Sequence, residues 1–131
     1  MGRPLMRYVY DSGTLIAIDN REREALRRHE ERLAGRDQLI VPAPVAAQVV
    51  RAPNRQARLM FALRGCQIVP FEKRHVAKVG MLLARSGTSD VVDGFVAVAA
   101  AEADAAVVTS DADDIGLLLG TLGARLAVLA P

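Results

Sequence analysis

Carboxylates gather in the last third of the chain, on both sides of a run of small apolar residues. Asp90 and Asp93 lie at the start of that run, and Asp111 and Asp114 follow it; Asp11 ends an earlier β-rich segment. In an α/β domain, ligands collect outside the carboxyl ends of the strands. Carboxylates that converge there repel one another unless a cation neutralises them, and Mg²⁺ or Mn²⁺ suits oxygen ligands of this kind.

These acids also have an ordinary structural interpretation. Asp90 and Asp111 can cap helices, and Asp93 and Asp114, three residues later, are favoured by the helix dipole. Asp90 and Asp93 are close enough on one helix to point to the same side. Their combined placement at strand and helix junctions favours a metal site. Its candidate ligands are Asp11, Asp93 and Asp111, with Asp90 and Asp114 as additional candidates.

Short apolar segments alternate with helical patterns along the whole chain. The expected strands are residues 5–10, 39–41, 67–69, 106–109 and 125–129. The expected helices are residues 14–20, 22–34, 43–51, 56–63, 72–85, 90–102 and 113–122, with Ser12 as the cap of the first. This alternation predicts an α/β fold, an α/β/α sandwich around a five-stranded, mostly parallel sheet. We expect a single domain over residues 1–131.

The composition is that of a folded chain. Of 131 residues, 51% are hydrophobic and 24% charged, and no apolar run approaches the ~18 residues of a membrane span. The single cysteine, Cys66, cannot form an internal disulfide, which fits the cytoplasm. With only two histidines, a zinc site of His and Cys ligands is disfavoured, so a bound metal would be a hard cation held by oxygen atoms.

Opposite charges are concentrated in different parts of the chain. Residues 21–64 carry ten arginines and five acids, whereas residues 90–114 carry seven acids and no arginine or lysine. A basic half beside an acidic site suggests a polyanionic substrate brought to a metal. For residues 21–36, a solvated helix face with salt bridges is an equally good interpretation.

Three short motifs resemble those of a known family. Residues 8–13 (Tyr-Val-Tyr-Asp-Ser-Gly), Asp93 before an Ala/Val-rich helix, and residues 107–111 (Val-Val-Thr-Ser-Asp) are similar to the acidic motifs of the PIN domain. The likeness is closest to the small bacterial VapC-type toxins of toxin–antitoxin pairs, and it covers nearly the whole chain. It implies a metal-dependent endoribonuclease of PIN-like fold. Asp11, Asp93 and Asp111 fall on the family's acids, which hold Mg²⁺ or Mn²⁺, and Thr109 falls on its hydroxyl residue.

The chain departs from the family pattern at one acid. The family usually has a Glu on the helix after the second strand, and Gln48 occupies that position here. An amide oxygen is a weaker ligand and carries no charge, so Asp90 or Asp114 would have to supply the missing charge. A second interpretation therefore stays open, in which a catalytically weakened PIN-fold protein acts mainly as a protein- or RNA-binding module.

Candidate substrate contacts lie beside these acids. Arg51 follows Gln48 by one helical turn and could meet a phosphate, and Ser12, Gln48 and Thr109 could also contact substrate. Arg55 and Arg58 could extend a basic strip, although ordinary surface solvation explains these arginines equally well. Aromatic residues make up only 4% of the chain, so RNA recognition would depend on phosphates and shape more than on base stacking.

The resemblance also implies protein partners. Such toxins bind an antitoxin across the acidic site and commonly form homodimers. An apolar face on residues 56–63 (Leu59, Met60 and Leu63, with Phe61 nearby) could be a docking groove or could close the core.

Two other enzyme and signalling classes that place an Asp after the first strand are disfavoured. A haloacid-dehalogenase-type phosphatase needs a second Asp where this chain has Gly13. A phosphoacceptor receiver domain needs a lysine near its last strand, but the only lysines, Lys73 and Lys78, lie in a predicted helix.

Overall fold

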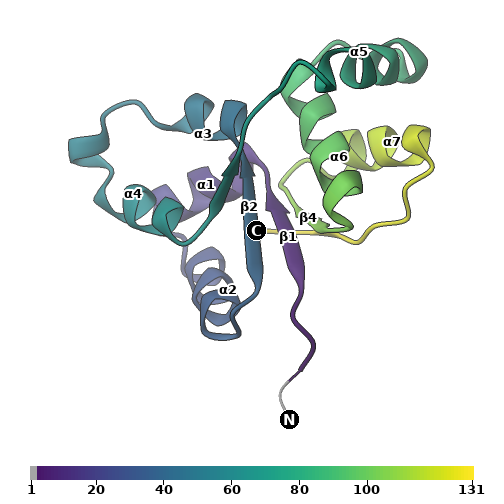
Figure 1. The fold of residues 1–131 in the computed structure, drawn as a ribbon. Helices are drawn as coiled ribbons and strands as arrows, with labels where there is room; N and C mark the ends of the chain where they lie inside the picture. The colour runs from purple at the N-terminus through teal and green to yellow at the C-terminus, as the bar shows by residue number, and fades with distance from the viewer. Residues whose placement is uncertain (1–2) are drawn as a thin grey trace.

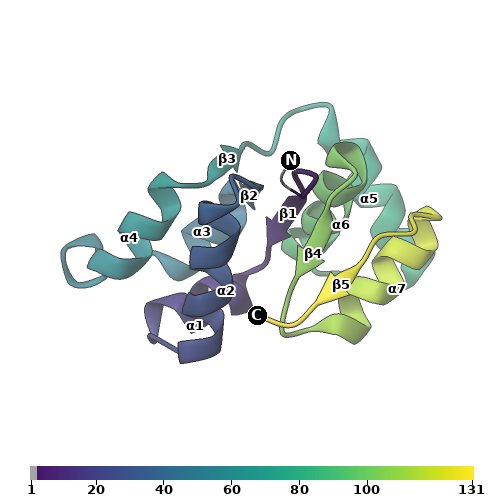
Figure 2. The same ribbon diagram turned by 90° about the horizontal axis from the view of Figure 1, so that it is seen from below.

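A five-stranded parallel sheet forms the centre of the computed structural model, which describes residues 3–131. Its order is β3-β2-β1-β4-β5, and all four pairings are parallel (Figures 1 and 2). The strands are β1 (Arg7–Tyr10), β2 (Gln38–Pro42), β3 (Gln67–Val69), β4 (Ala106–Val108) and β5 (Val128–Leu129). The expected five-stranded α/β fold is confirmed.

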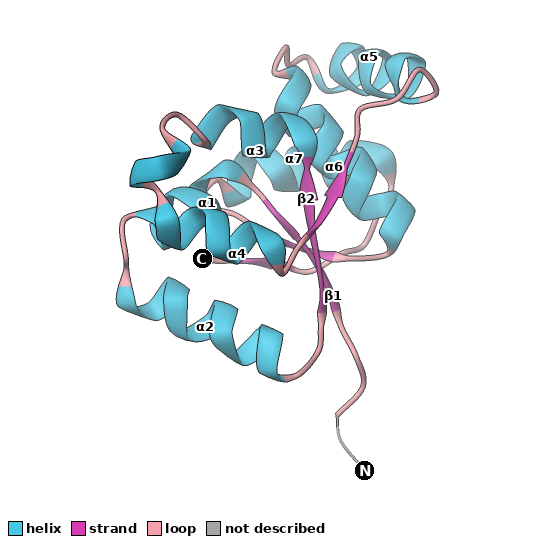
Figure 3. Ribbon diagram, turned by 60° about the vertical axis from the view of Figure 1, so that its left-hand side comes forward, coloured by secondary structure: helices cyan, strands magenta, loops and turns pink. Residues whose placement is uncertain are grey.

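Two groups of helices cover the sheet. On one side, α1 packs against α2, α3 and α4; on the other, α6 packs against α5 and α7 (Figures 1 and 3). Their bounds are α1 (Ser12–Asp19), α2 (Arg23–Ala34), α3 (Ala43–Val49), α4 (Ala57–Arg64), α5 (His75–Ser86), α6 (Val91–Ala103) and α7 (Ala112–Leu122), with a 3₁₀ turn, η1 (Pro53–Arg55). No helix within residues 3–131 is long and apolar enough to cross a membrane.

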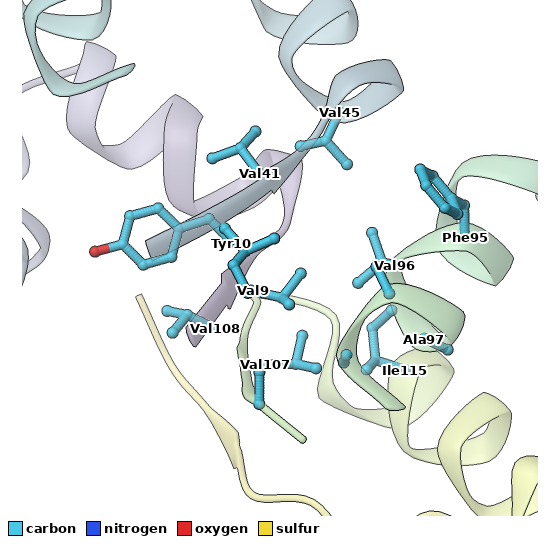
Figure 4. Packing of buried hydrophobic residues seen from close by; sticks show 14 of the residues in the cluster. Val9, Tyr10, Val41, Val45, Phe95, Val96, Ala97, Val107, Val108 and Ile115 are labelled. Atoms are coloured by element: carbon cyan, nitrogen blue, oxygen red, sulfur yellow. The ribbon is translucent and has the colours of Figure 1, made fainter. Parts of the chain in front are cut away.

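Core side chains lie on both faces of the central strands, against α6 on one face and against α1 on the other. Val9, Tyr10, Val107 and Val108 are fully buried, and all residues of α6 from position 94 to 100 are buried as well (Figure 4). A helix buried over seven consecutive residues must be packed on several sides. The small side chains of α6 explain how it can contact β1, β2 and β4 as well as α5 and α7.

Several element boundaries differ from those expected. Asp11, and not Ser12, caps α1: its Oδ1 accepts a hydrogen bond from the Ser12 amide at 2.7 Å, and Ser12 is the first helical residue. The helix after β2 ends at Val49, so Arg51 lies outside it. On α4, Leu59 is fully buried and closes the core, whereas the side chain of Phe61 is exposed. A docking role for that face stays a prediction.

A cluster of charged side chains fixes α5 to α6. Glu102 on α6 accepts hydrogen bonds from Arg74 Nη1 (2.8 Å), His75 Nε2 (3.1 Å) and Lys78 Nζ (2.9 Å). His75 is fully buried, and its Nδ1 accepts from the Glu72 amide at 2.9 Å, so Nε2 carries the proton given to Glu102. Burial alone would raise the pKa of Glu102, but the three donors lower it to about 2.

Replacing Glu102 with Gln should therefore destabilise the protein in a pH-dependent way. The folded-state pKa lies below the usual 4.5, so the stability that ionised Glu102 contributes is present above about pH 4.5 and lost as pH falls towards 2. Urea unfolding should show Glu102→Gln less stable than wild type at pH 7, with a gap that narrows below pH 4.5. Glu30→Gln, on exposed α2 surface, is the control. A gap that stays constant down to pH 3 would contradict the assignment.

Candidate metal centre

The pairing of β1 with β4 places two loops side by side at the carboxyl edge of the sheet. Tyr10 is in register with Val108, and the Asp11 amide donates to the Val108 carbonyl at 3.0 Å. The buried hydroxyl of Thr14 donates to the same carbonyl at 2.8 Å. The residues that follow the two strands, Asp11 and Thr109, are therefore adjacent although 98 positions separate them.

Asp11 is held rigidly at this edge. Only 3% of its surface is exposed; Oδ2 accepts from Thr109 Oγ1 at 2.8 Å, and Oδ1 accepts from the Ser12 amide. The same Thr109 oxygen accepts from the Asp111 amide at 2.9 Å. Thr109 thus links the carboxylate after β1 to the loop that carries Asp111, while Ser12 contributes its backbone N–H.

Three further carboxylates converge beside this pair. Oxygen atoms of Asp93, Asp111 and Asp114 lie within 4.8 Å of one another. Their hollow has a volume of about 330 Å³ and is lined by Thr88, Ser89, Asp90, Asp93, Asp111, Asp114 and Leu118. We call it the acidic hollow.

The two acids that could have been simple helix caps behave differently. Asp90 caps α6, because its Oδ1 accepts from the Asp93 amide at 3.0 Å. Asp111 occupies the cap position of α7 but makes no capping hydrogen bond with its side chain. The carboxylate of Asp111 is therefore free to turn towards Asp93 and Asp114.

Burial and the close approach of these carboxylates raise the pKa values of Asp93 and Asp111. The pKa of Asp93 is raised to about 6 by burial and by the negative charges of Asp90, Asp11, Asp111 and Asp114, in that order. The pKa of Asp111 is raised too, by desolvation and by Asp114. A compact set of oxygen donors with excess negative charge fits a hard divalent cation such as Mg²⁺ or Mn²⁺.

Two of the expected substrate contacts lie elsewhere. Gln48 is exposed on α3 and is not among the residues that line the acidic hollow. Arg51 folds back onto α3, where its Nη1 donates to the carbonyls of Ala47 (2.7 Å) and Val50 (3.0 Å). Both remain predictions as substrate contacts, and neither side chain supplements the acidic cluster in the way that Asp114 does.

The structure gives Gly13 a role that sequence reasoning did not assign. A Cβ atom built on Gly13 would clash with Ser110 Oγ and lie 3.0 Å from Ser110 Cβ. The absence of a side chain lets the first turn of α1 touch the loop after β4, which brings Asp11 towards Asp111. The Gly that follows Asp-Ser at a strand end was the available signal for this close approach.

The fold and the acids together define a family. The model of the PIN domain family matches residues 8–115, which include both central strands, Asp11, Asp93 and Asp111. The chain belongs to the PIN domain family.

Solved structures share its fold at low sequence identity. A crystal structure of VapBC2 from Rickettsia felis bound to a promoter DNA fragment matches with a TM-score of 0.70 and 18% identity, over 95% of this chain and 98% of that one. FitAB bound to the IR36 DNA fragment matches with a TM-score of 0.67 and 14% identity, over 95% and 94%. PAE2754 from Pyrobaculum aerophilum matches with a TM-score of 0.61 and 16% identity, over 97% of this chain and 92% of that one. No curated protein matches in sequence.

Removing one crowded carboxylate should stabilise the metal-free protein. The folded pKa of Asp93, about 6, lies above the usual 3.8, so ionising Asp93 costs stability as pH rises through this window. In EDTA at pH 7.5, Asp93→Asn should raise the free energy of unfolding by about 1–2 kcal/mol after solvent screening, and the gain should vanish near pH 4.

Metal should reverse the order of stability. If Mg²⁺ or Mn²⁺ binds the folded wild type at this cluster, it should raise the melting temperature, whereas Asp93→Asn should respond weakly. If wild type and variant gain equally from the cation, Asp93 is not a ligand.

Proposed function

We propose that this protein is a metal-dependent endoribonuclease that hydrolyses RNA phosphodiester bonds and acts as the toxin of a toxin–antitoxin pair. The observation that carries the proposal is the convergence of Asp93, Asp111 and Asp114 beside buried Asp11 at one sheet edge of a PIN fold. PIN domains are generally metal-dependent nucleases, and this carboxylate set fits the metal that such chemistry requires.

Asp93, Asp111 and Asp114 would hold the metal, and Asp11 and Asp90 are further candidate ligands, directly or through water. When bound, Mg²⁺ or Mn²⁺ supplies a water of lowered pKa and neutralises charge on the phosphoryl group. Asp11 is a rigid acceptor because Thr109 and the Ser12 amide fix both of its oxygens. Thr109 therefore acts as a positioning residue, since its oxygen already bonds Asp11 and the Asp111 amide.

RNA is the substrate that the charge distribution favours. Nine of the ten arginines in residues 21–64 lie at least partly on the surface and provide positive charge. The acidic hollow alone would repel an anionic substrate unless a metal were bound there. Arg51, Arg55 and Arg58 are the proposed phosphate contacts. Arg51 would need to release its bonds to the α3 carbonyls, or use its remaining N–H donors, in order to bind.

The proposed partners follow from the fold neighbours. The structures of VapBC2 and FitAB each contain a bound DNA fragment, in the case of VapBC2 from the promoter. We propose that this chain likewise has a cognate antitoxin, forms a homodimer and works in the cytoplasm.

One observation favours the second candidate function, that of a weakened PIN-fold binding module. Gln48 stands at the position on α3 where the family usually has a Glu. The site therefore lacks one carboxylate of the usual family pattern. Asp114 offsets this loss, because its oxygen lies within the cluster of Asp93 and Asp111. The nuclease is therefore the function that the geometry supports better.

Cleavage assays with charge-removing variants test the nuclease. Asp11→Asn and Asp93→Asn should each lower RNA cleavage by about 100-fold or more and relieve growth arrest on expression, because each removes an acid of the metal centre. EDTA should stop cleavage by wild type, and Mn²⁺ or Mg²⁺ should restore it. The matched control is Asp113→Asn, an exposed acid outside the acidic hollow. Unchanged cleavage in both variants would rule out the proposal.

Restoring the family's carboxylate tests the alignment of α3. Gln48→Glu should tighten Mn²⁺ binding by about 10-fold if residue 48 can turn towards the site, because it adds a charged oxygen ligand. Isothermal titration calorimetry measures this affinity, with Gln67→Glu on exposed β3 as the control. An unaltered binding curve would show that position 48 takes no part in the metal centre.

A further inference from the structure

A second hollow lies at the opposite end of the sheet, between α2 and the starts of β1 and β2. Its volume is about 550 Å³, and it is lined by Arg3, Tyr8, Arg28, Glu31, Arg32 and Asp37. Figure 1 shows α2 beside the end of the sheet at which β2 begins, away from the start of α6. We call it the arginine hollow; the acidic hollow shares no lining residue with it.

Arg32 is the unusual residue of this hollow. Only 8% of its surface is exposed, and its guanidinium carbon lies 4.7 Å from the centre of the Tyr8 ring and 5.6 Å from that of Tyr10. Within residues 3–131, its side chain makes one hydrogen bond, from Nη1 to Tyr10 Oη at 3.3 Å, and no ion pair. A buried charge without a direct counter-ion is costly, and the guanidinium retains several unused N–H donors.

The carboxylates beside Arg32 are engaged by other arginines. Asp37 accepts both guanidinium N–H groups of Arg3, at 2.7 and 3.1 Å, and also the Met6 amide at 3.0 Å. Glu31 is paired with Arg27 on the outer face of α2. Arg28 Nη1 donates to the backbone oxygen of Pro131 at 2.8 Å, and its Nη2 lies 3.8 Å from Glu24. Among the residues that line the hollow, three arginines accompany two carboxylates.

A polar cluster lies behind Arg32. Tyr10 Oη accepts from Arg32 Nη1 and lies 2.8 Å from His29 Nδ1. The other ring nitrogen of His29, Nε2, is buried and has no hydrogen-bond partner among the described residues.

We propose that the arginine hollow binds a phosphate group, carried by a free nucleotide or by an RNA strand, through Arg32 and Arg28. A guanidinium fork recognises phosphate in bidentate fashion, and the Tyr8 ring already holds that of Arg32 in place. A volume of about 550 Å³ falls within the range of small-molecule sites. The site is separate from the metal centre and does not require nuclease activity.

Binding measured without metal tests this site alone. In EDTA, calorimetry with inorganic phosphate and adenosine monophosphate, and fluorescence anisotropy with a labelled RNA oligonucleotide, should detect at least one ligand. Arg28→Gln and Arg32→Gln should each weaken that binding by about 10-fold. Arg85→Gln, an exposed arginine on α5, is the charge-matched control and should leave affinity unchanged.

Each outcome decides the matter. Binding of the mononucleotide identifies a free nucleotide as the source of the phosphate, whereas binding of RNA alone identifies a strand. Equal weakening by Arg85→Gln would reduce the effect to net charge and overturn the proposal, as would a lack of binding by all three probes. If Arg32→Gln fails to fold, as circular dichroism would show, Arg28→Gln, on the half-exposed side of the hollow, decides alone.

Discussion

Repulsion between carboxylates is the constraint around which this protein is built. Asp93, Asp111 and Asp114 hold oxygens within 4.8 Å of one another, and only rigid supports can keep like charges so close without a cation. The supports are helix starts: Asp93 lies in the first turn of α6, and Asp114 in the first turn of α7. Unpaired N–H groups at these helix ends carry partial positive charge, which offsets part of the repulsion. Without a cation, the remaining repulsion between these carboxylates destabilises the fold.

The second requirement is that distant parts of the chain meet accurately, and the β1–β4 pairing provides this. Parallel register fixes Tyr10 opposite Val108, and the hydroxyl groups of Thr14 and Thr109 then connect the two strand ends. The contact between Gly13 and Ser110 leaves no space for a side chain between the loops. Backbone pairing, buried hydroxyls and one missing side chain together determine where the carboxylate of Asp11 lies.

Local patterns predicted most of the fold but only part of the site. The alternating strands and helices could be predicted from the sequence because apolar periodicity depends on residues that are close along the chain, as in the buried run of α6. The bridging role of Thr109 was not readable, since it depends on the register of strands about 100 positions apart. Asp114 was an additional candidate ligand from the sequence, but its place in the cluster depends on how α7 packs. Arg51 falls outside α3 because that helix ends two residues before the expected end.

The strand order also affects when the acidic cluster can form during synthesis. β1 leaves the ribosome well before its neighbour β4, which begins only at Ala106. Chains are made from the amino end at about 5–20 residues per second, so one side of β1 stays unpaired for several seconds. During that interval Asp11 has neither Thr109 nor Asp111 beside it. The connectivity of the sheet therefore delays assembly of the acidic cluster until Asp114 has emerged.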